Sequence, residues 1–182
     1  NVIDSKRKLY YLVFALIISS LVVSFIGLYQ YKIGADIQES WVDKELNPDI
    51  KTRVYSTLEN PNILAEYLIL VIPMTIALLW SNRNKTNKLI YFLILCAQLS
   101  CIILTLSRGG WLGIILSMII FAIFIDRRLL IVYILLVTAV LMISPKVILT
   151  RVASIGNMND TSTSFRFPLW MVGIEMIKDF FI

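Results

Sequence analysis

The chain has 182 residues, of which 58% are hydrophobic and 16% are charged, and its mean hydropathy is +0.80. Soluble domains are about 45–50% apolar and about 25% charged, so this composition excludes a soluble fold and predicts an integral membrane protein. The net charge of +5 does not gather on a soluble basic module, and nucleic acid is therefore a poor candidate for a partner. The sequence has no histidine, and Cys96 and Cys101 share one apolar run, so we expect no disulfide, metal or other cofactor.

Five apolar runs predict five membrane spans within one all-α transmembrane domain that covers residues 1–182. A helix needs about 20 residues to cross a bilayer core. The predicted spans are residues 9–29, 62–80, 89–106, 111–125 and 129–149. Asn60 suits the cap of the second helix and Pro61 its first position, while Pro73 predicts a kink. The fifth run is short unless it continues through Pro145 to about Leu149.

The basic residues predict the orientation of these spans. Eight of the 17 basic residues fall in the N-terminal segment and two short turns, accompanied only by Asp4 and Asp126: Lys6, Arg7, Lys8, Arg83, Lys85, Lys88, Arg127 and Arg128. By the positive-inside rule these segments are cytoplasmic. The N-terminus is then inside the cell, and the 30–60 loop, the Ser107–Gly110 turn and the 150–182 tail are outside.

The tail predicts one further helix. A polar stretch is followed by Phe165–Ile182, where apolar side chains share one helical side: Trp170, Ile174, Ile177 and Phe181. This pattern is typical of an amphipathic helix that lies in the membrane interface or packs on the bundle. Because the chain stops abruptly at Ile182, we expect it to be a fragment of a longer protein.

The stretch Thr105–Trp111 interrupts two apolar runs with a single cation, Arg108. An arginine at a bilayer centre costs roughly 2.5–3.5 kcal/mol on insertion scales, so Arg108 must lie near an interface or face a polar cavity. Gly109 and Gly110 allow backbone or a ligand to approach closely, and the amphipathic ring of Trp111 suits an interface. We therefore predict a turn at the membrane surface whose arginine meets an anion; the alternative is an arginine that snorkels to water.

The predicted topology places four arginines on the outer face: Arg53, Arg108, Arg151 and Arg166. Guanidinium groups bind phosphate bidentately and stay charged at any relevant pH. Several of them at one membrane surface suit a diphosphate whose lipid tail lies in the bilayer. The alternative is that each arginine snorkels alone.

Other polar residues are candidates to support such a site. Glu66 is the only acid well inside a predicted span, and intramembrane acids usually face the protein interior with a partner. We expect it to pair with one of the arginines, or to act as a proton acceptor or a ligand of an acceptor sugar. Asn60 and Asn62 could cap the second helix or bind sugar hydroxyls, with capping favoured for Asn60, and Ser107 adjoins Arg108.

Two segments resemble a known family. Arg53–Ala65 (RVYSTLENPNILA) resembles the arginine-then-NPN segment of O-antigen ligase and polymerase-like membrane proteins, and Thr105–Leu112 (TLSRGGWL) resembles their SRG[AG]W turn. The segment Arg151–Arg166, with Trp170, resembles the stretch before their large extracytoplasmic loop. The resemblance covers about residues 50–182.

The resemblance implies a metal-independent glycosyltransferase with a GT-C-like helical bundle, of which this chain is an incomplete part. Such an enzyme passes a glycan from an undecaprenyl-diphosphate carrier to a lipid, a growing glycan or a protein outside the cytoplasmic membrane. Outer arginines hold the diphosphate, and a histidine in the following loop assists the acceptor. That histidine is absent here, so the catalytic residue is unknown and we expect this fragment to be inactive by itself.

Two alternatives remain. A transporter for an anion or a lipid-linked sugar would also use arginines and broken spans, but it should show paired discontinuous helices in repeated halves. A non-catalytic membrane scaffold would leave the SRGGW match unexplained.

Overall fold

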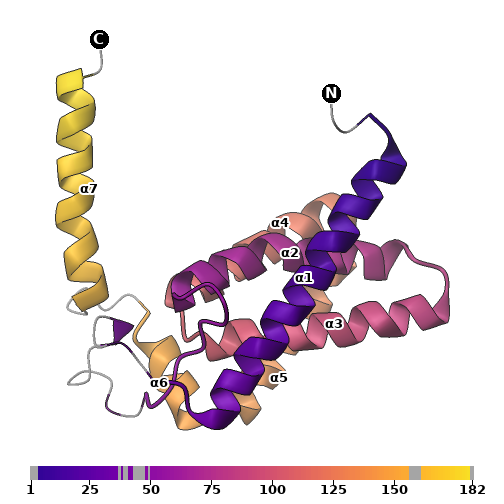
Figure 1. Ribbon diagram of the computed structural model, residues 1–182, viewed down its shortest axis with the longest axis horizontal. Helices are drawn as coiled ribbons and strands as arrows, with labels where there is room; N and C mark the ends of the chain where they lie inside the picture. The colour runs from indigo at the N-terminus through magenta and orange to yellow at the C-terminus, as the bar shows by residue number, and fades with distance from the viewer. Residues whose placement is uncertain are drawn as a thin grey trace.

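The computed structural model describes residues 4–36, 38, 41–42, 48, 50–155 and 161–180, with backbone alone at 161–166. Within these residues the chain is all helical, and no strand occurs (Figure 1). The helices are α1 (Lys6–Ile33), α2 (Pro61–Ser81), α3 (Lys85–Leu104), α4 (Arg108–Ile125), α5 (Arg128–Ile143), α6 (Lys146–Ala153) and α7 (Thr161–Phe180). The predicted all-α membrane class is confirmed.

Helices α1 to α4 are each long and apolar enough to cross a membrane. The predicted fifth span, residues 129–149, consists of two helices, because α5 ends at Ile143 and α6 begins at Lys146 with a bend of 120° between them. Pro145 explains the bend, because it lacks an N–H group and disfavours helical backbone at the residue before it. At 16 residues α5 is about 24 Å long, shorter than the roughly 30 Å bilayer core, so a fifth span requires the bent pair.

The core of the bundle lies between α1, α2, α3 and α4. Helix α1 crosses α2 and α3 obliquely (Figure 1), and the residues Ile17, Leu64, Leu68, Ile72 and Ile102 are almost fully buried. Two glycines bring helices close together. A Cβ atom on Gly27 would lie 2.7 Å from Cys101 Sγ, and one on Gly110 would lie 2.6 Å from Ala65 Cβ. Small residues at such crossings let membrane helices gain packing contacts that lipid cannot supply.

A polar side chain joins three helices inside this core. Gln98 of α3 is 0% exposed and donates to Ser20 Oγ of α1 at 2.6 Å and to Thr75 Oγ1 of α2 at 3.1 Å. Both hydroxyls in turn donate to carbonyls of their own helices. Hydrogen bonds of this kind hold membrane helices in a fixed register.

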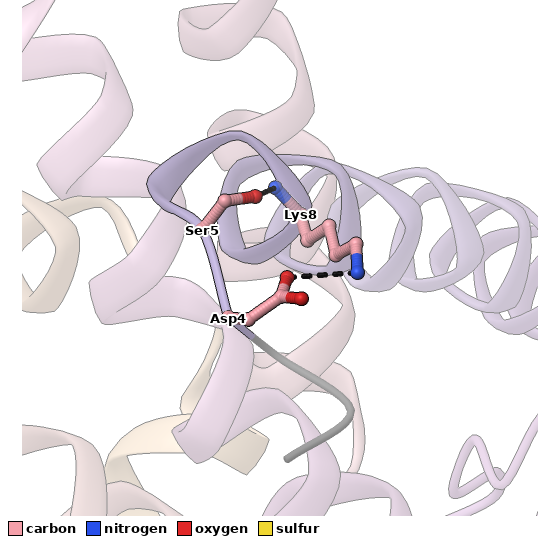
Figure 2. Close-up of polar contacts among 3 residues, drawn as sticks. All are labelled: Asp4, Ser5 and Lys8. Carbon is pink, nitrogen blue, oxygen red and sulfur yellow. Dashed lines mark hydrogen bonds and ion pairs between the residues drawn. The ribbon is translucent and has the colours of Figure 1, made fainter.

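The start of α1 marks one end of the bundle. Ser5 caps the helix by accepting from Lys8 N at 3.3 Å, and Lys8 Nζ lies 2.7 Å from Asp4 Oδ1 (Figure 2).

Tyr10 OH lies 3.2 Å from Tyr91 OH, which joins the first part of α1 to the first part of α3. These two helices therefore run parallel, and the α2–α3 and α4–α5 turns lie at the same end as the start of α1. All eight basic residues of these segments are exposed.

Helix α7 stands apart from the other helices (Figure 1). Its described side chains, from Phe167 to Phe180, are exposed apart from the half-buried Gly173, and Trp170 is 63% exposed. The sequence left two alternatives for this helix, a position in the membrane interface or packing on the bundle. The described part of α7 does not pack on the bundle. Phe181, which the predicted apolar side includes, lies outside the described residues.

Candidate anion site at the junction of α3 and α4

The chain reverses between α3 and α4 in only three residues, Thr105, Leu106 and Ser107. The predicted turn at Ser107–Gly110 is therefore placed too late, because Arg108 already begins α4. Ser107 is the cap that starts this helix early: its Oγ accepts from Gly110 N at 3.3 Å. Leu106 adopts a φ of 51°, a left-handed conformation that non-glycine residues rarely take.

The two glycines after Arg108 have different surroundings. Gly110 is buried against Ala65, so the helix α2 itself makes the close approach that the sequence predicted. Gly109 is exposed, and a Cβ atom built on it would meet no atom within 4 Å. The space beside the first turn of α4 is therefore open at Gly109.

Trp111 is 8% exposed, and its Nε1 donates to Ile102 O at 3.2 Å. The ring is therefore packed against the end of α3 and holds α4 to it. The last carbonyls of α3 offer the indole an acceptor inside the protein.

Arg53 is 2% exposed and bonds to three parts of the chain. Its Nε donates to Thr105 O at 2.8 Å, its Nη1 to Trp41 O at 2.6 Å and its Nη2 to Asn62 Oδ1 at 3.3 Å. This guanidinium joins the loop before α2, the first turn of α2 and the end of α3.

Arg151 and Arg108 join the same junction to α6. Arg151 is 4% exposed, and its Nε donates to Leu106 O at 3.3 Å. Arg108 is half-buried, and its Nη1 donates to Ser154 O, just after α6, at 2.9 Å. Three of the four predicted arginines therefore surround one turn. The side chain of Arg166, on α7, lies outside the described residues.

The asparagines and Ser107 support this junction. Asn60 caps α2 by accepting from Asn62 N at 2.8 Å, as the sequence predicted. Asn62 Oδ1 accepts from Ser107 Oγ at 2.9 Å as well as from Arg53. Asn62 therefore links the start of α2 to the cap of α4.

Glu66 is exposed on α2, and within the described part of the chain it forms no ion pair with an arginine. The expected pairing is therefore not what the structure shows. The physical reason is helical register, because the inward side of α2 is occupied by Leu64, Ala65 and Leu68.

Sequence reasoning missed Gln30, which fixes the segment that carries Arg53. Its Oε1 accepts from Tyr55 N at 3.2 Å and from Ser56 N at 2.7 Å, while its Nε2 donates to Ser56 O at 3.0 Å. The sequence signal that could have identified Gln30 was a single amide side chain at the end of an apolar run. The carbonyls that accept hydrogen bonds from the arginines had no sequence signal, because every residue type has a carbonyl.

The family model described as O-antigen ligase matches residues 90–182, about half of the chain. The chain belongs to the O-antigen ligase family. This confirms the family resemblance predicted from the sequence and identifies a membrane protein of polysaccharide biosynthesis, in a family of glycan-transferring enzymes. The matched part of this O-antigen ligase family member contains Arg108, Arg151 and Arg166, whereas Arg53 and Glu66 precede it. Comparison with curated proteins and with solved structures finds no match.

Proposed function

We propose that this O-antigen ligase family protein transfers a glycan from an undecaprenyl-diphosphate carrier to an acceptor, with Arg108 as the contact to the diphosphate. The observation that carries the proposal is the position of Arg108, half-buried in the first turn of α4 beside the open Gly109. Family membership supports glycan transfer in general. The carrier and the role of Arg108 are parts of the proposal.

The chemistry of the leaving group explains why a guanidinium suits this position. The bond between the anomeric carbon and the diphosphate oxygen breaks, and the oxygen keeps the electron pair. An acceptor hydroxyl oxygen bonds to the anomeric carbon, and its proton passes to a base. Positioned cations stabilise the charge that develops on the departing diphosphate, and the positive end of the α4 dipole adds to the same field. Since the protein supplies these cations, we propose a metal-independent reaction.

The distribution of cations supports placing the site outside the cell. The eight exposed basic residues of the α1 start and of the two short turns lie at the opposite end of the bundle from Arg108. Under the positive-inside rule that end is cytoplasmic and the N-terminus is inside. The diphosphate site then opens on the extracytoplasmic face.

Two further residues keep the roles proposed from the sequence. Glu66 lies one helical turn below Asn62 on α2, about 6 Å along the axis. Its exposed carboxylate could accept hydrogen bonds from hydroxyls of the acceptor sugar, whether the acceptor is a glycan, a lipid or a protein-linked sugar. Arg166 stays a proposed second ligand of the diphosphate.

A transporter is the competing function, and one observation favours it: the 120° break between α5 and α6. A transporter with repeated halves would need a second such break, and the described helices contain this one pair alone. Glycan transfer therefore accounts for more of the described structure.

The decisive assay uses the complete natural chain in phospholipid vesicles with a radiolabelled glycan on undecaprenyl diphosphate. We expect label to appear in a new glycosidic bond to the acceptor, together with released undecaprenyl diphosphate. Movement of the intact lipid-linked glycan across the vesicle membrane, without a new bond, would instead establish a transporter.

A further inference from the structure

The end of α3 is bonded from outside the helix at three successive carbonyls. Val54 N donates to Leu104 O at 3.2 Å, Arg53 Nε to Thr105 O at 2.8 Å and Arg151 Nε to Leu106 O at 3.3 Å. The final carbonyls of a helix have no partner within the helix. In this protein the loop before α2 and the helix α6 supply those partners.

Cations are well suited to this position. The C-terminus of a helix carries a partial negative charge, which positively charged side chains stabilise. Arg53 and Arg151 are 2% and 4% exposed, and an arginine at such depth needs acceptors for its N–H groups. The carbonyls at the end of α3 are among those acceptors.

The same two arginines brace a strained residue. Leu106 has a φ of 51°, and non-glycine residues keep such a conformation only when surrounding contacts enforce it. Arg53 bonds the carbonyl before Leu106, and Arg151 bonds the carbonyl of Leu106 itself. Arg53 also bonds Asn62, which accepts from Ser107, the cap of α4. These contacts determine where α4 starts, and Arg108 is its first residue.

We infer that Arg53 and Arg151 are positioning residues, which fix the α3–α4 turn and thereby the place of Arg108, and that they are not ligands of the diphosphate. The inference rests on the proposed function for the role of Arg108, but the bracing of the turn can be measured without it. The inference separates the arginines predicted from the sequence into positioning residues, Arg53 and Arg151, and proposed ligands of the diphosphate, Arg108 and Arg166. Both buried guanidinium groups already donate their Nε to main-chain oxygens of the turn.

The first experiment measures the turn directly. A spin label is placed at Gly109→Cys, where the space is open, in a complete chain whose exposed native thiol is removed by Cys96→Ser. Arg53→Gln and Arg151→Gln should each increase the mobility of the label, measured well below the melting temperature and without substrate. The matched controls Lys51→Gln and Lys146→Gln remove the same charge from exposed positions of the same segments and should leave the spectrum unchanged.

The second experiment is a double-mutant cycle for glycan transfer in the unlabelled protein, expressed per folded molecule. Each Arg→Gln change should lower kcat/KM on the order of 10- to 100-fold by misplacing Arg108. In an Arg108→Ala background the same change should cost less than about twofold, because its effect passes through Arg108.

Three results would overturn the inference: an unchanged label spectrum, increased mobility with wild-type transfer, or a full further loss in the Arg108→Ala background. The last result would identify Arg53 or Arg151 as a direct ligand. If Arg108→Ala itself transfers normally, the proposed role of Arg108 fails, and the label spectrum alone then decides whether the two arginines brace the turn.

Discussion

Replacing Arg108 by alanine tests the proposed site most directly. The substitution removes the half-buried guanidinium at the start of α4 and its 2.9 Å hydrogen bond to Ser154 O. Loss of one donor that stabilises a developing anion costs about 2.7–4 kcal/mol, or roughly 10²–10³ in rate. The fold should lose far less, because each partly solvated hydrogen bond contributes only on the order of 1 kcal/mol. We therefore expect transfer to collapse while the melting temperature falls by only about 2–4 °C for each such bond.

The assay is transfer of labelled glycan from undecaprenyl diphosphate by the complete chain in vesicles. Arg108→Lys should restore only part of the rate, because an ammonium keeps the charge but loses the bidentate fork. Lys146→Ala, which removes an exposed cation from α6, is the control and should transfer normally. If Arg108→Ala keeps more than about half of the wild-type rate, against this expected loss, or if lysine is fully equivalent to arginine, Arg108 does not bind the diphosphate.

Three further predictions test orientation, the acceptor and packing. In a background without the native cysteines, Glu59→Cys should react with an impermeant thiol reagent from outside the cell and Asn84→Cys should not; the reverse pattern would invert the proposed topology. Glu66→Gln should leave the melting temperature unchanged, since its exposed carboxylate has no ion pair in the described part of the chain, but should raise KM for the acceptor; unchanged transfer would exclude a role for it. Gly110→Ala should destabilise the protein by about 1–3 kcal/mol by forcing α2 and α4 apart. Gly109→Ala, in open space, should be neutral or should stabilise the protein by about 0.5–1 kcal/mol. Equal effects of the two substitutions in thermal unfolding would contradict the close α2–α4 contact.

Hydropathy located the helices because a membrane imposes a simple rule. Residues that face lipid are predominantly apolar over a length set by the bilayer, so apolar runs mark spans regardless of their partners. Helix caps were equally predictable from the sequence. Asn60 accepts from the first turn of α2, and this depends only on residues next to it in the chain. The bend at Pro145 was predictable but was not predicted, since proline acts through its own ring and the preceding residue.

The roles of the polar residues were less predictable because they depend on contacts between distant segments. Glu66 is an acid inside a span, and charge alone suggested an arginine partner. The helical register of α2 turns it outward instead. Trp111 donates to Ile102 O nine positions earlier because the α3–α4 turn is short.

The sequence by itself determined the membrane class, the helical content and the family, because these follow from local composition and short motifs. Only the tertiary structure decided how Arg53, Arg108 and Arg151 differ. All guanidinium groups have the same chemistry, so their roles depend on which oxygens surround them. Arg53 and Arg151 meet main-chain carbonyls at the end of α3, and these oxygens have no residue-specific signal. Arg108 is left half-exposed beside the open Gly109 because the cap at Ser107 makes Arg108 the first residue of α4.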